Sequence, residues 1–205
     1  MIAEKLRTAV VKAALTGKLT EDYRKYHMVS QQDSWRTLTV KDVIVKHKGG
    51  GTPSKSNPKY WGGNIPWASI KDLKSPRLAH TKDTITEAGL NSSSTNLIPP
   101  GAVIVGMRMG VGKLTINDVP VAINQDLRAL IPDPVIQAEF LMLALSGATF
   151  EGTGATVKGI KLSQLLETEI KVPSKNEQTE ILHRVAEIGM LIDRLAELER
   201  ERERI

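Results

Sequence analysis

Hydrophobic positions recur at helical spacing near the start of the 205-residue chain. The positions that share one face are Ile2, Leu6, Ala9 and Ala13. Their spacings of four, three and four residues predict a short helix over residues 2–16. Gly17 fits a C-terminal cap of that helix. The polar stretch over residues 18–34 then indicates a linker.

The last thirty residues carry the strongest helical pattern. Ser174 and Glu177 predict an N-terminal capping box. Apolar residues then repeat every seven positions in two seams, a pattern typical of a coiled coil. The seams are Ile181, Ile188 and Leu195 in one, and Leu191, Leu198 and Ile205 in the other.

This helix has two interpretations. It either packs on its own domain or pairs with another chain. We favour pairing because the helix is long and its outer face is almost wholly charged. The candidate dimerisation residues are Ile181, Ile188, Leu191, Leu195 and Leu198.

Short apolar runs separated by turn residues fill the middle of the chain and predict an antiparallel, strand-rich domain over residues 35–173. The predicted strands are 102–105, 114–116, 119–123, 127–131 and 169–172. Residues 35–45 are expected to form a short strand or a strand after one helical turn, and residues 65–73 a strand and a turn. Helices are expected at 134–145 and 162–166, and residues 74–100 are expected to be irregular or to form short strands.

The predicted fold class is therefore α+β. It combines a strand-rich domain with a short N-terminal helix and a long, coiled-coil-forming C-terminal helix. The predicted parts are residues 1–34, 35–173 and 174–205.

Charge is spread unevenly along the chain, whose net charge is +5. Residues 1–34 carry +2, residues 35–175 carry +6 and residues 176–205 carry −3. A basic middle and an acidic end fit a nucleic-acid-binding body with a protein-binding tail. Many soluble domains carry a similar surplus, so charge alone does not decide the function.

Composition narrows the class further. The chain has no cysteine, and its four histidines show no ligand spacing, which excludes thiolate zinc sites and predicts no metal site. No apolar run approaches the length of a membrane span, and the first residues do not resemble a secretory signal. We therefore expect a cytoplasmic protein without a membrane partner.

A loop over residues 46–67 holds four cations and no acidic residue. The cations are Lys46, Lys48, Lys55 and Lys59. Glycines at 49–51 allow backbone N–H groups to approach an anion, and Tyr60, Trp61 and Trp67 follow. This chemistry suits DNA. The alternative is a solvated turn whose aromatic side chains form a local core.

Motifs for catalysis are weak. The glycine-rich stretch 106–113 lacks the spacing of a phosphate-binding loop, and its flanks are predicted strands. Asp133, Glu169 and Lys171 resemble a metal-dependent nuclease set only superficially. We expect no catalytic residue in this chain.

Three segments in order resemble the DNA-specificity subunit of type I restriction–modification systems. The first is Gly50–Ser54 with Tyr60–Trp67 and Asp72-Leu73. The second is Pro100–Val105 with Gly110–Lys113 and Ala122–Gln125. The third is Val172-Pro173 with Glu177-Gln178 and Ile181. Together they span about residues 35–205.

Residues 6–19 resemble a fourth segment, one that in this family follows the recognition domain. Its position here, together with a single recognition domain where the full subunit has two, is similar to a half-sized, circularly permuted specificity subunit. The resemblance implies a non-catalytic protein that reads double-stranded DNA and positions methyltransferase subunits. S-adenosylmethionine would belong to those subunits, and ATP and Mg²⁺ to a restriction subunit.

A half subunit would form a homodimer to rebuild two readers, and dimer symmetry predicts an interrupted palindromic target. Residues 181–205 would form about 37 Å of helix. That length is close to one turn of B-DNA, roughly 34–36 Å.

The candidate DNA contacts fall into three groups. Phosphate contacts are expected from Lys46, Lys48, Lys55 and Lys71. Base-edge or positioning contacts are expected from Thr52, Ser54, Ser56, Asn124 and Gln125, with Arg108 suited to guanine. Two further loops contribute candidates. Lys113 lies in the same turn as Arg108, and Thr156 and Lys158 are expected to hold the DNA backbone. For each, the alternative is a structural turn residue.

Two competing functions remain open from the sequence. The first is a stand-alone DNA-binding regulator that dimerises through the C-terminal helix. The second is a small nuclease built on Asp133, Glu169 and Lys171.

Overall fold

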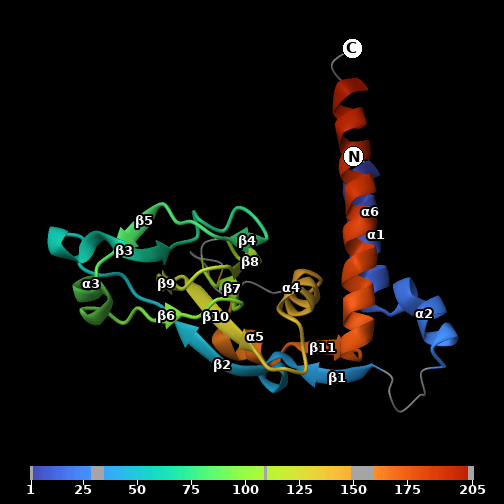
Figure 1. The fold of residues 1–205 in the computed structure, drawn as a ribbon, viewed down its shortest axis with the longest axis horizontal. Helices are drawn as coiled ribbons and strands as arrows, with labels where there is room; N and C mark the ends of the chain where they lie inside the picture. The colour runs from blue at the N-terminus through green and yellow to red at the C-terminus, as the bar shows by residue number, and fades with distance from the viewer. Residues whose placement is uncertain (1, 29–34, 109, 149–158, 203–205) are drawn as a thin grey trace. The chain divides into compact units, whose positions relative to one another are not determined.

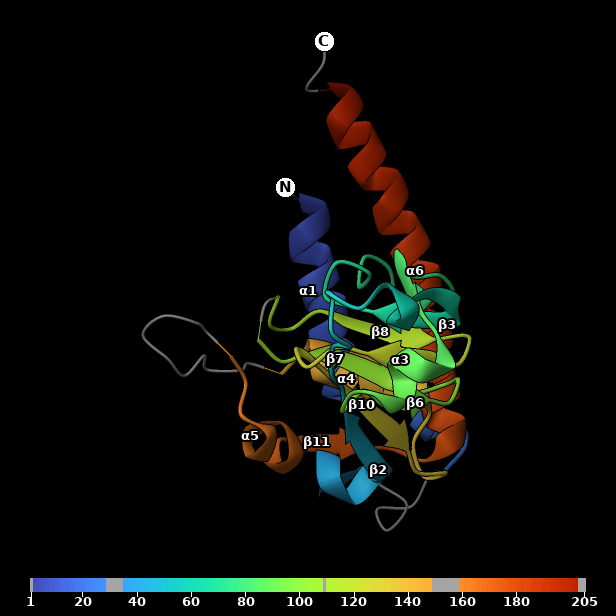
Figure 2. The same ribbon diagram turned by 90° about the vertical axis from the view of Figure 1, so that its left-hand side faces the viewer.

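The structure is a computed structural model that describes residues 2–28, 35–108, 110–148 and 159–202. The chain forms two compact units (Figures 1 and 2). A helical unit combines residues 1–38 with residues 170–205, and a strand-rich unit comprises residues 39–169. Both helices and strands are therefore present, and the α+β prediction is confirmed.

The unit boundaries differ from the parts predicted from sequence. The strand-rich unit is four residues shorter at each end than the predicted domain 35–173. The terminal segments, predicted as separate parts, join in one unit because two helices pack together.

The helical unit is built on α1 (Ile2–Leu15) and α6 (Lys175–Arg202), which pack antiparallel. Ala3 and Ala14 of α1 are buried, and such small side chains allow close approach of the two helices. On α6, Ile181 and Ile192 are buried. Antiparallel packing places the start of α1 beside the end of α6, where Glu199 accepts the Ile2 N–H at 3.0 Å.

Residues beyond α1 are helical rather than extended. Gly17, with φ 75°, ends α1 in the left-handed region, as predicted. A 3₁₀ turn η1 (Lys18–Thr20) and α2 (Glu21–Tyr26) follow. The prediction of a linker is therefore wrong for residues 18–26. The sequence signal is weak there because α2 has no buried residue and is held by polar contacts.

One of these polar contacts comes from Arg184 of α6. Its guanidinium donates to the Leu19 carbonyl at 2.8 Å, to Asp22 Oδ1 at 2.6 Å and to Glu180 Oε1 at 2.6 Å. The first two bonds join η1 and α2 to α6, and the third lies within α6.

Glu177 is the centre of a buried polar network in the same unit. Only 1% of Glu177 is exposed. Its Oε1 accepts from Thr20 Oγ1 at 2.7 Å, from Trp35 Nε1 at 3.1 Å and from the Arg24 guanidinium. The carboxylate therefore points away from its own helix end.

The predicted capping box is only half formed as a result. Ser174 Oγ accepts the Glu177 N–H at 3.3 Å, but the Glu177 side chain does not return to the cap. The carboxylate instead ties α6 to η1 and α2.

A small sheet joins β1 (Arg36–Thr39) and β11 (Glu169–Val172). The strand-rich unit holds two further sheets. The five-stranded sheet has the order β2 (Ile44–Gly49), β10 (Leu127–Pro132), β7 (Val103–Gly106), β8 (Leu114–Asn117), β4 (Arg77–Leu78). The four-stranded sheet has the order β5 (Asp83–Ile85), β3 (Trp61–Ala68), β9 (Val121–Ile123), β6 (Leu97–Ile98).

Short helices complete this unit. They are η3 (Val40–Val43), η4 (Pro58–Tyr60), α3 (Glu87–Asn91), α4 (Ala138–Ser146) and α5 (Leu162–Glu167). Helix α4 packs on β7 and β8, and α5 packs on η3. Burial of Phe140 and Leu141 fixes the inner face of α4.

The core lies between the two sheets. Its main apolar cluster takes Ile104 and Ala129 from the larger sheet and Val121 and Ile123 from the smaller one. A second cluster surrounds Trp67, Ile85 and Ala122. Alternate strand residues thus face the same core from both sheets.

The prediction of a uniformly antiparallel middle is wrong at two pairs. Strand β3 runs parallel to β9, and β4 runs parallel to β8. The strand β2 was also missed in part, because residues 46–49 were predicted as loop. As an edge strand, β2 shows polar residues on both faces and lacks apolar alternation.

We expect Glu177→Ala to destabilise the protein by about 3–5 kcal/mol, because it leaves the half-buried Arg24 guanidinium without its carboxylate. Urea unfolding followed by circular dichroism measures the loss. Arg7→Ala is the matched control, because it breaks an exposed α1–α6 ion pair with Asp193 and should cost at most about 1 kcal/mol. Equal losses in the two variants would contradict a special role for Glu177.

Candidate nucleic-acid interface

The glycine-rich loop after β2 is held against the protein's own backbone. A Cβ atom on Gly50 would overlap the Ile123 carbonyl, and one on Gly51 would overlap the Ser94 side chain. The Gly51 N–H donates to the Ile123 carbonyl at 3.0 Å. The absent side chains therefore make room for strand β9 and its neighbours, and the loop is a frame rather than an anion cradle.

The two tryptophans of the loop region belong to the same frame. Trp67 Nε1 donates to the Gly51 carbonyl at 3.1 Å, and Trp61 Nε1 donates to the Ser54 carbonyl at 3.1 Å. The two rings meet edge to face, with centroids 5.1 Å apart. With Lys55 and Asp83 they line a hollow of about 360 Å³. Indole N–H groups thus fix the path of residues 51–54.

Several predicted base-reading residues lie around this frame. Thr52 Oγ1 donates to Gln125 Oε1 at 2.5 Å, and the Ser54 and Ser56 hydroxyls lie 2.8 Å apart. Ser54, Ser56 and Gln125 are exposed. Thr52 and Gln125 therefore join the loop to the turn after β9.

Asn124 has a different environment from its neighbour Gln125. Its side chain is buried, with Oδ1 accepting the Asp126 N–H at 3.1 Å and Nδ2 donating to Asp126 Oδ2 at 3.2 Å. This geometry shapes the turn between β9 and β10. Asn124 is thus placed as a turn residue, whereas Gln125 presents its amide to solvent.

The predicted phosphate contacts divide between free and tethered lysines. Lys46, Lys55, Lys71 and Lys113 are exposed. Lys48, by contrast, donates through Nζ to the Leu97 carbonyl at 3.2 Å. The exposed set offers cations along β2 and at three loops of one unit.

The hairpin between β7 and β8 carries Arg108 and Lys113. Strands on both sides confirm the prediction that this stretch is not a strand-to-helix phosphate loop. Arg108 is 61% exposed and lies 3.8 Å from Asp126. This loose pairing leaves the guanidinium available to a ligand. Thr156 and Lys158, the predicted clamp, lie outside the described residues.

Two candidate residues were missed from the sequence, His47 and Arg128. Both lie on neighbouring strands, β2 and β10. Burial, followed by the charge of Arg128, lowers the pKa of His47. Burial also lowers the pKa of Arg128. One feature of the sequence could have pointed to this pair: Arg128 is a charged residue between the apolar neighbours Leu127 and Ala129.

The nuclease interpretation gains no support from the geometry. Asp133 Oδ1 accepts the Val135 N–H at 2.9 Å and caps a turn. Within the described ranges, no three His, Cys, Asp or Glu side chains gather as a metal site. In the same part of the chain, no helix is long and apolar enough to cross a membrane.

A strand-rich unit bearing exposed cations and an antiparallel helix pair is the fold of a DNA-specificity protein, as comparison with known proteins shows. Residues 32–201 match the family described as "Type I restriction modification DNA specificity domain". The chain therefore belongs to this family, as the resemblance in its sequence predicted.

Two curated relatives support this assignment. The chain is 31% identical over 204 residues to the type I restriction enzyme EcoR124I/EcoR124II specificity subunit of Escherichia coli, covering 90% of this chain and 50% of that protein. It is 32% identical over 156 residues to the MjaIX specificity subunit of Methanocaldococcus jannaschii, covering 72% and 36%. The chain thus spans half the length or less of these relatives.

Solved structures show the same fold. A chain from a study of complex assembly and conformational transition of the type I R-M system superposes with a TM-score of 0.69. The identity is 20%, and the match covers 98% of this chain and 52% of that chain.

We expect Gly50→Ala to cost several kcal/mol of stability, because the new methyl group overlaps the Ile123 carbonyl. Thermal unfolding of the purified variant measures the loss. Gly189→Ala is the control: its Cβ meets nothing within 4 Å on helix α6, so we expect a gain of up to about 1 kcal/mol. A Gly50→Ala variant as stable as wild type would refute the frame interpretation.

Proposed function

We propose that this chain is the non-catalytic DNA-recognition component of a type I restriction–modification complex. The observation that carries this proposal is the family match over residues 32–201, which includes the whole strand-rich unit. The exposed cations of that unit support it, since phosphate neutralisation supplies much of the affinity for duplex DNA. The named relatives are specificity subunits of type I restriction enzymes.

DNA contacts are assigned by exposure. Lys46, Lys55, Lys71 and Lys113 bind phosphates, because their side chains are exposed. Arg108 and Gln125 read base edges, since each presents a planar hydrogen-bonding group near the same turn. Asn124, held by Asp126, positions that turn.

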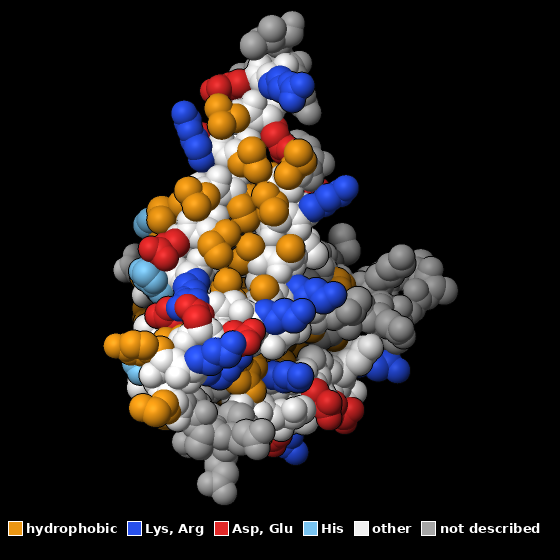
Figure 3. Space-filling model, turned by 90° about the vertical axis from the view of Figure 1, so that its right-hand side faces the viewer, with side chains coloured by type: hydrophobic (Ala, Val, Ile, Leu, Met, Phe, Trp, Pro, Cys, Tyr) orange, Lys and Arg blue, Asp and Glu red, His pale blue; other side chains and the backbone are white. Residues whose placement is uncertain are grey.

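A second copy of the chain supplies the second DNA-recognition unit. On α6, Leu191 is 71% exposed, Met190 66% and Leu198 48%, and on α1 Ile2 is 62% exposed. Apolar side chains run along this helix pair between charged groups (Figure 3). Such a continuous apolar stripe is typical of an interface. Two helix pairs meeting there form a four-helix arrangement.

The two predicted seams of α6 have different neighbours. Ile181 is fully buried by its own unit, so its side chain is not part of the exposed stripe. Ile188 and Leu195, which belong to the same seam as Ile181, are half-buried. Leu191 and Leu198 carry the intermolecular contact.

Symmetry of such a dimer defines the target. Two identical recognition units read an interrupted palindrome. The 28 residues of α6 extend about 42 Å, which suits half-sites separated by about one turn of B-DNA. The helix pair therefore acts as the spacer between readers.

The chemistry belongs to partner subunits. Methyltransferase subunits bring S-adenosylmethionine, and a restriction subunit, where one is present, brings ATP and Mg²⁺. Recognition of intracellular duplex DNA places the complex in the cytoplasm.

A methylation assay tests the function. A type I methyltransferase subunit encoded beside this chain should methylate a defined DNA site only when the chain is added, with labelled S-adenosylmethionine as donor. The positions of methylated bases are mapped by sequencing. Site-specific methylation without the chain would contradict the proposal. Specific DNA binding without any methyltransferase association would favour a stand-alone regulator.

The dimer is tested with Leu191→Glu combined with Leu198→Glu. Introducing four carboxylates into an apolar interface should raise the dimer dissociation constant at least about 100-fold. Light scattering after gel filtration should then report a monomer. His183→Glu with Arg194→Glu alters exposed polar positions of the same helix and should remain dimeric. A dimer that survives the leucine changes would place the interface elsewhere.

A further inference from the structure

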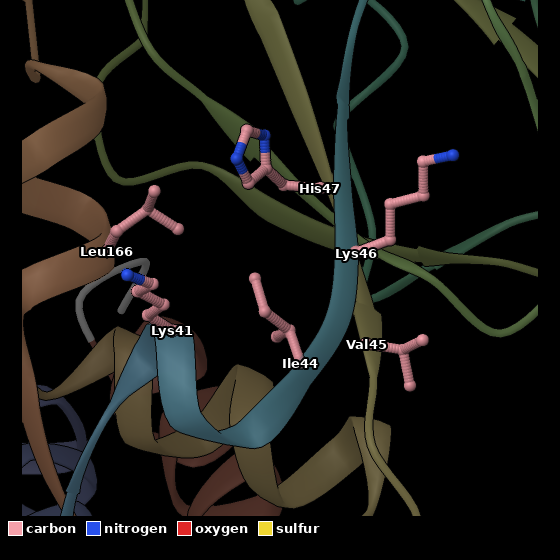
Figure 4. A pocket seen from close by; sticks show the side chains of 6 residues that line it. All are labelled: Lys41, Ile44, Val45, Lys46, His47 and Leu166. Atoms are coloured by element: carbon pink, nitrogen blue, oxygen red, sulfur yellow. The ribbon is translucent and has the colours of Figure 1, made fainter.

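The edge strand β2 carries different cations on its two faces. Because side chains alternate along a strand, Lys46 and Lys48 share one face while His47 and Gly49 share the other. Figure 4 shows Lys46 pointing away from His47 across the strand. The face of His47 holds none of the phosphate contacts assigned above.

Pairing with β10 adds a second cation to this face. Leu130 lies opposite His47, and Arg128 lies opposite Gly49. Arg128 is therefore a diagonal neighbour of His47 on the same face. A Cβ atom on Gly49 would lie 2.8 Å from Arg128 Nη1 and 3.2 Å from Cζ. The glycine thus provides the space in which the guanidinium lies.

Within the described part of the chain, neither His47 nor Arg128 has a partner of opposite charge. Among the residues that the structure describes, Arg128 makes no hydrogen bond or ion pair, and its Nε is buried. His47 Nδ1 is likewise buried without a partner. Other arginines are paired: Arg77 contacts Asp118 and Glu139, and Arg184 contacts Asp22 and Glu180.

An unpaired, half-buried guanidinium is unfavourable in the free protein. An anion bound beside it would remove that cost and satisfy the buried N–H groups.

A hollow of about 460 Å³ adjoins His47. Figure 4 shows His47 and Ile44 facing it from β2, with Lys41 of η3 and Leu166 of α5 on the opposite side. Val45 and Lys46 also line it, with side chains that Figure 4 shows directed to the other side of the strand. No acidic residue lines it. His47 on β2 and Arg128 on the neighbouring strand β10 share one face of the sheet, and Lys41 of η3 faces His47 across the hollow. We call these three basic side chains the basic row.

We propose that the basic row binds a phosphate group of the DNA backbone. This inference rests on the proposed DNA-recognition function and extends it to the second face of β2. Arg128 supplies a planar pair of donors suited to phosphate oxygens, and Lys41 adds a mobile charge. Because Lys46 lies on the opposite face, both faces of the edge strand contact phosphates of the DNA backbone. Phosphate contacts of this kind position the protein and carry no sequence code.

Salt-dependent binding of a random-sequence 30-base-pair duplex tests the proposal. Arg128→Gln should weaken binding roughly tenfold and reduce the slope of log affinity against log salt by about 0.9 per recognition domain. Lys41→Gln, at an exposed position, should reduce the slope in the same direction. Arg77→Gln is the matched control: it removes the same charge from an arginine already paired with two carboxylates, and its slope should equal that of wild type.

Thermal unfolding separates a binding effect from a folding effect. Because Arg128 has no partner to lose, Arg128→Gln should be at least as stable as wild type. An unfolded Arg128→Gln protein would leave Lys41→Gln as the deciding variant. If Arg128→Gln and Lys41→Gln both bind DNA with the affinity and slope of Arg77→Gln, the basic row is not a DNA contact.

A readout without DNA distinguishes failure of this inference from failure of the proposed function. Inorganic phosphate and pyrophosphate are titrated while the ring ¹⁵N resonances of His47 are followed by NMR. Saturable shifts that disappear in Arg128→Gln support the site. If they occur although wild type binds no duplex, the site takes a small phosphate and the DNA function fails. If His47 does not respond and the variants bind DNA as wild type does, the basic row is overturned while the DNA function stands.

Discussion

The candidate interface depends on the carbonyl oxygen of Ile123, where three segments meet. It accepts the Gly51 N–H at 3.0 Å and the Thr95 hydroxyl at 2.8 Å. Gly50 lies so close to it that only a residue without a side chain fits. Buried backbone groups must find partners, and this single acceptor thereby fixes the loop after β2 to strand β9. The positions of Thr52, Ser54 and Gln125 follow from that attachment.

The helical unit depends on how the apolar residues of one helix divide between a buried side and an exposed side. One side of α6 buries Ile181 and Ile192 against its own unit, while Leu191 and Leu198 remain exposed. A heptad pattern alone does not say which seam meets which partner. The polar network around Glu177 makes the choice, because it ties α6 to η1 and α2 on one side. Leu191 and Leu198 remain exposed on the other side, where we propose that a second chain binds.

Sequence reasoning predicted the elements with strong periodicity and missed those without it. Helices α1 and α6 and strands β7 to β11 lie near their predicted places, because apolar side chains in each face a core. Strand β2 and helix α2 were not recognised, since an edge strand and a surface helix need no apolar face. The parallel pairing of β3 with β9 is a long-range feature that no local pattern encodes.

For the candidate site, the sequence indicated which residues carry charged or polar groups, but it did not predict how buried they are or which residues lie beside them. Lys46 and Lys55 of the loop are exposed, whereas Lys48 is tethered to the Leu97 carbonyl and Asn124 is buried in a turn. His47 and Arg128 escaped notice because they lie 81 positions apart and meet only through the register of β2 with β10. Among the described residues Arg128 has no ion-pair partner, and this too depends on the folded structure and not on local sequence.

The attachment of the interface through backbone atoms has an evolutionary consequence. Ile123 offers a carbonyl and Gly50 and Gly51 offer no side chains, so the frame persists whatever residues decorate it. Exposed side chains such as Arg108 and Gln125 can therefore be exchanged without repacking the core. The surface of this unit can therefore change while its scaffold stays the same.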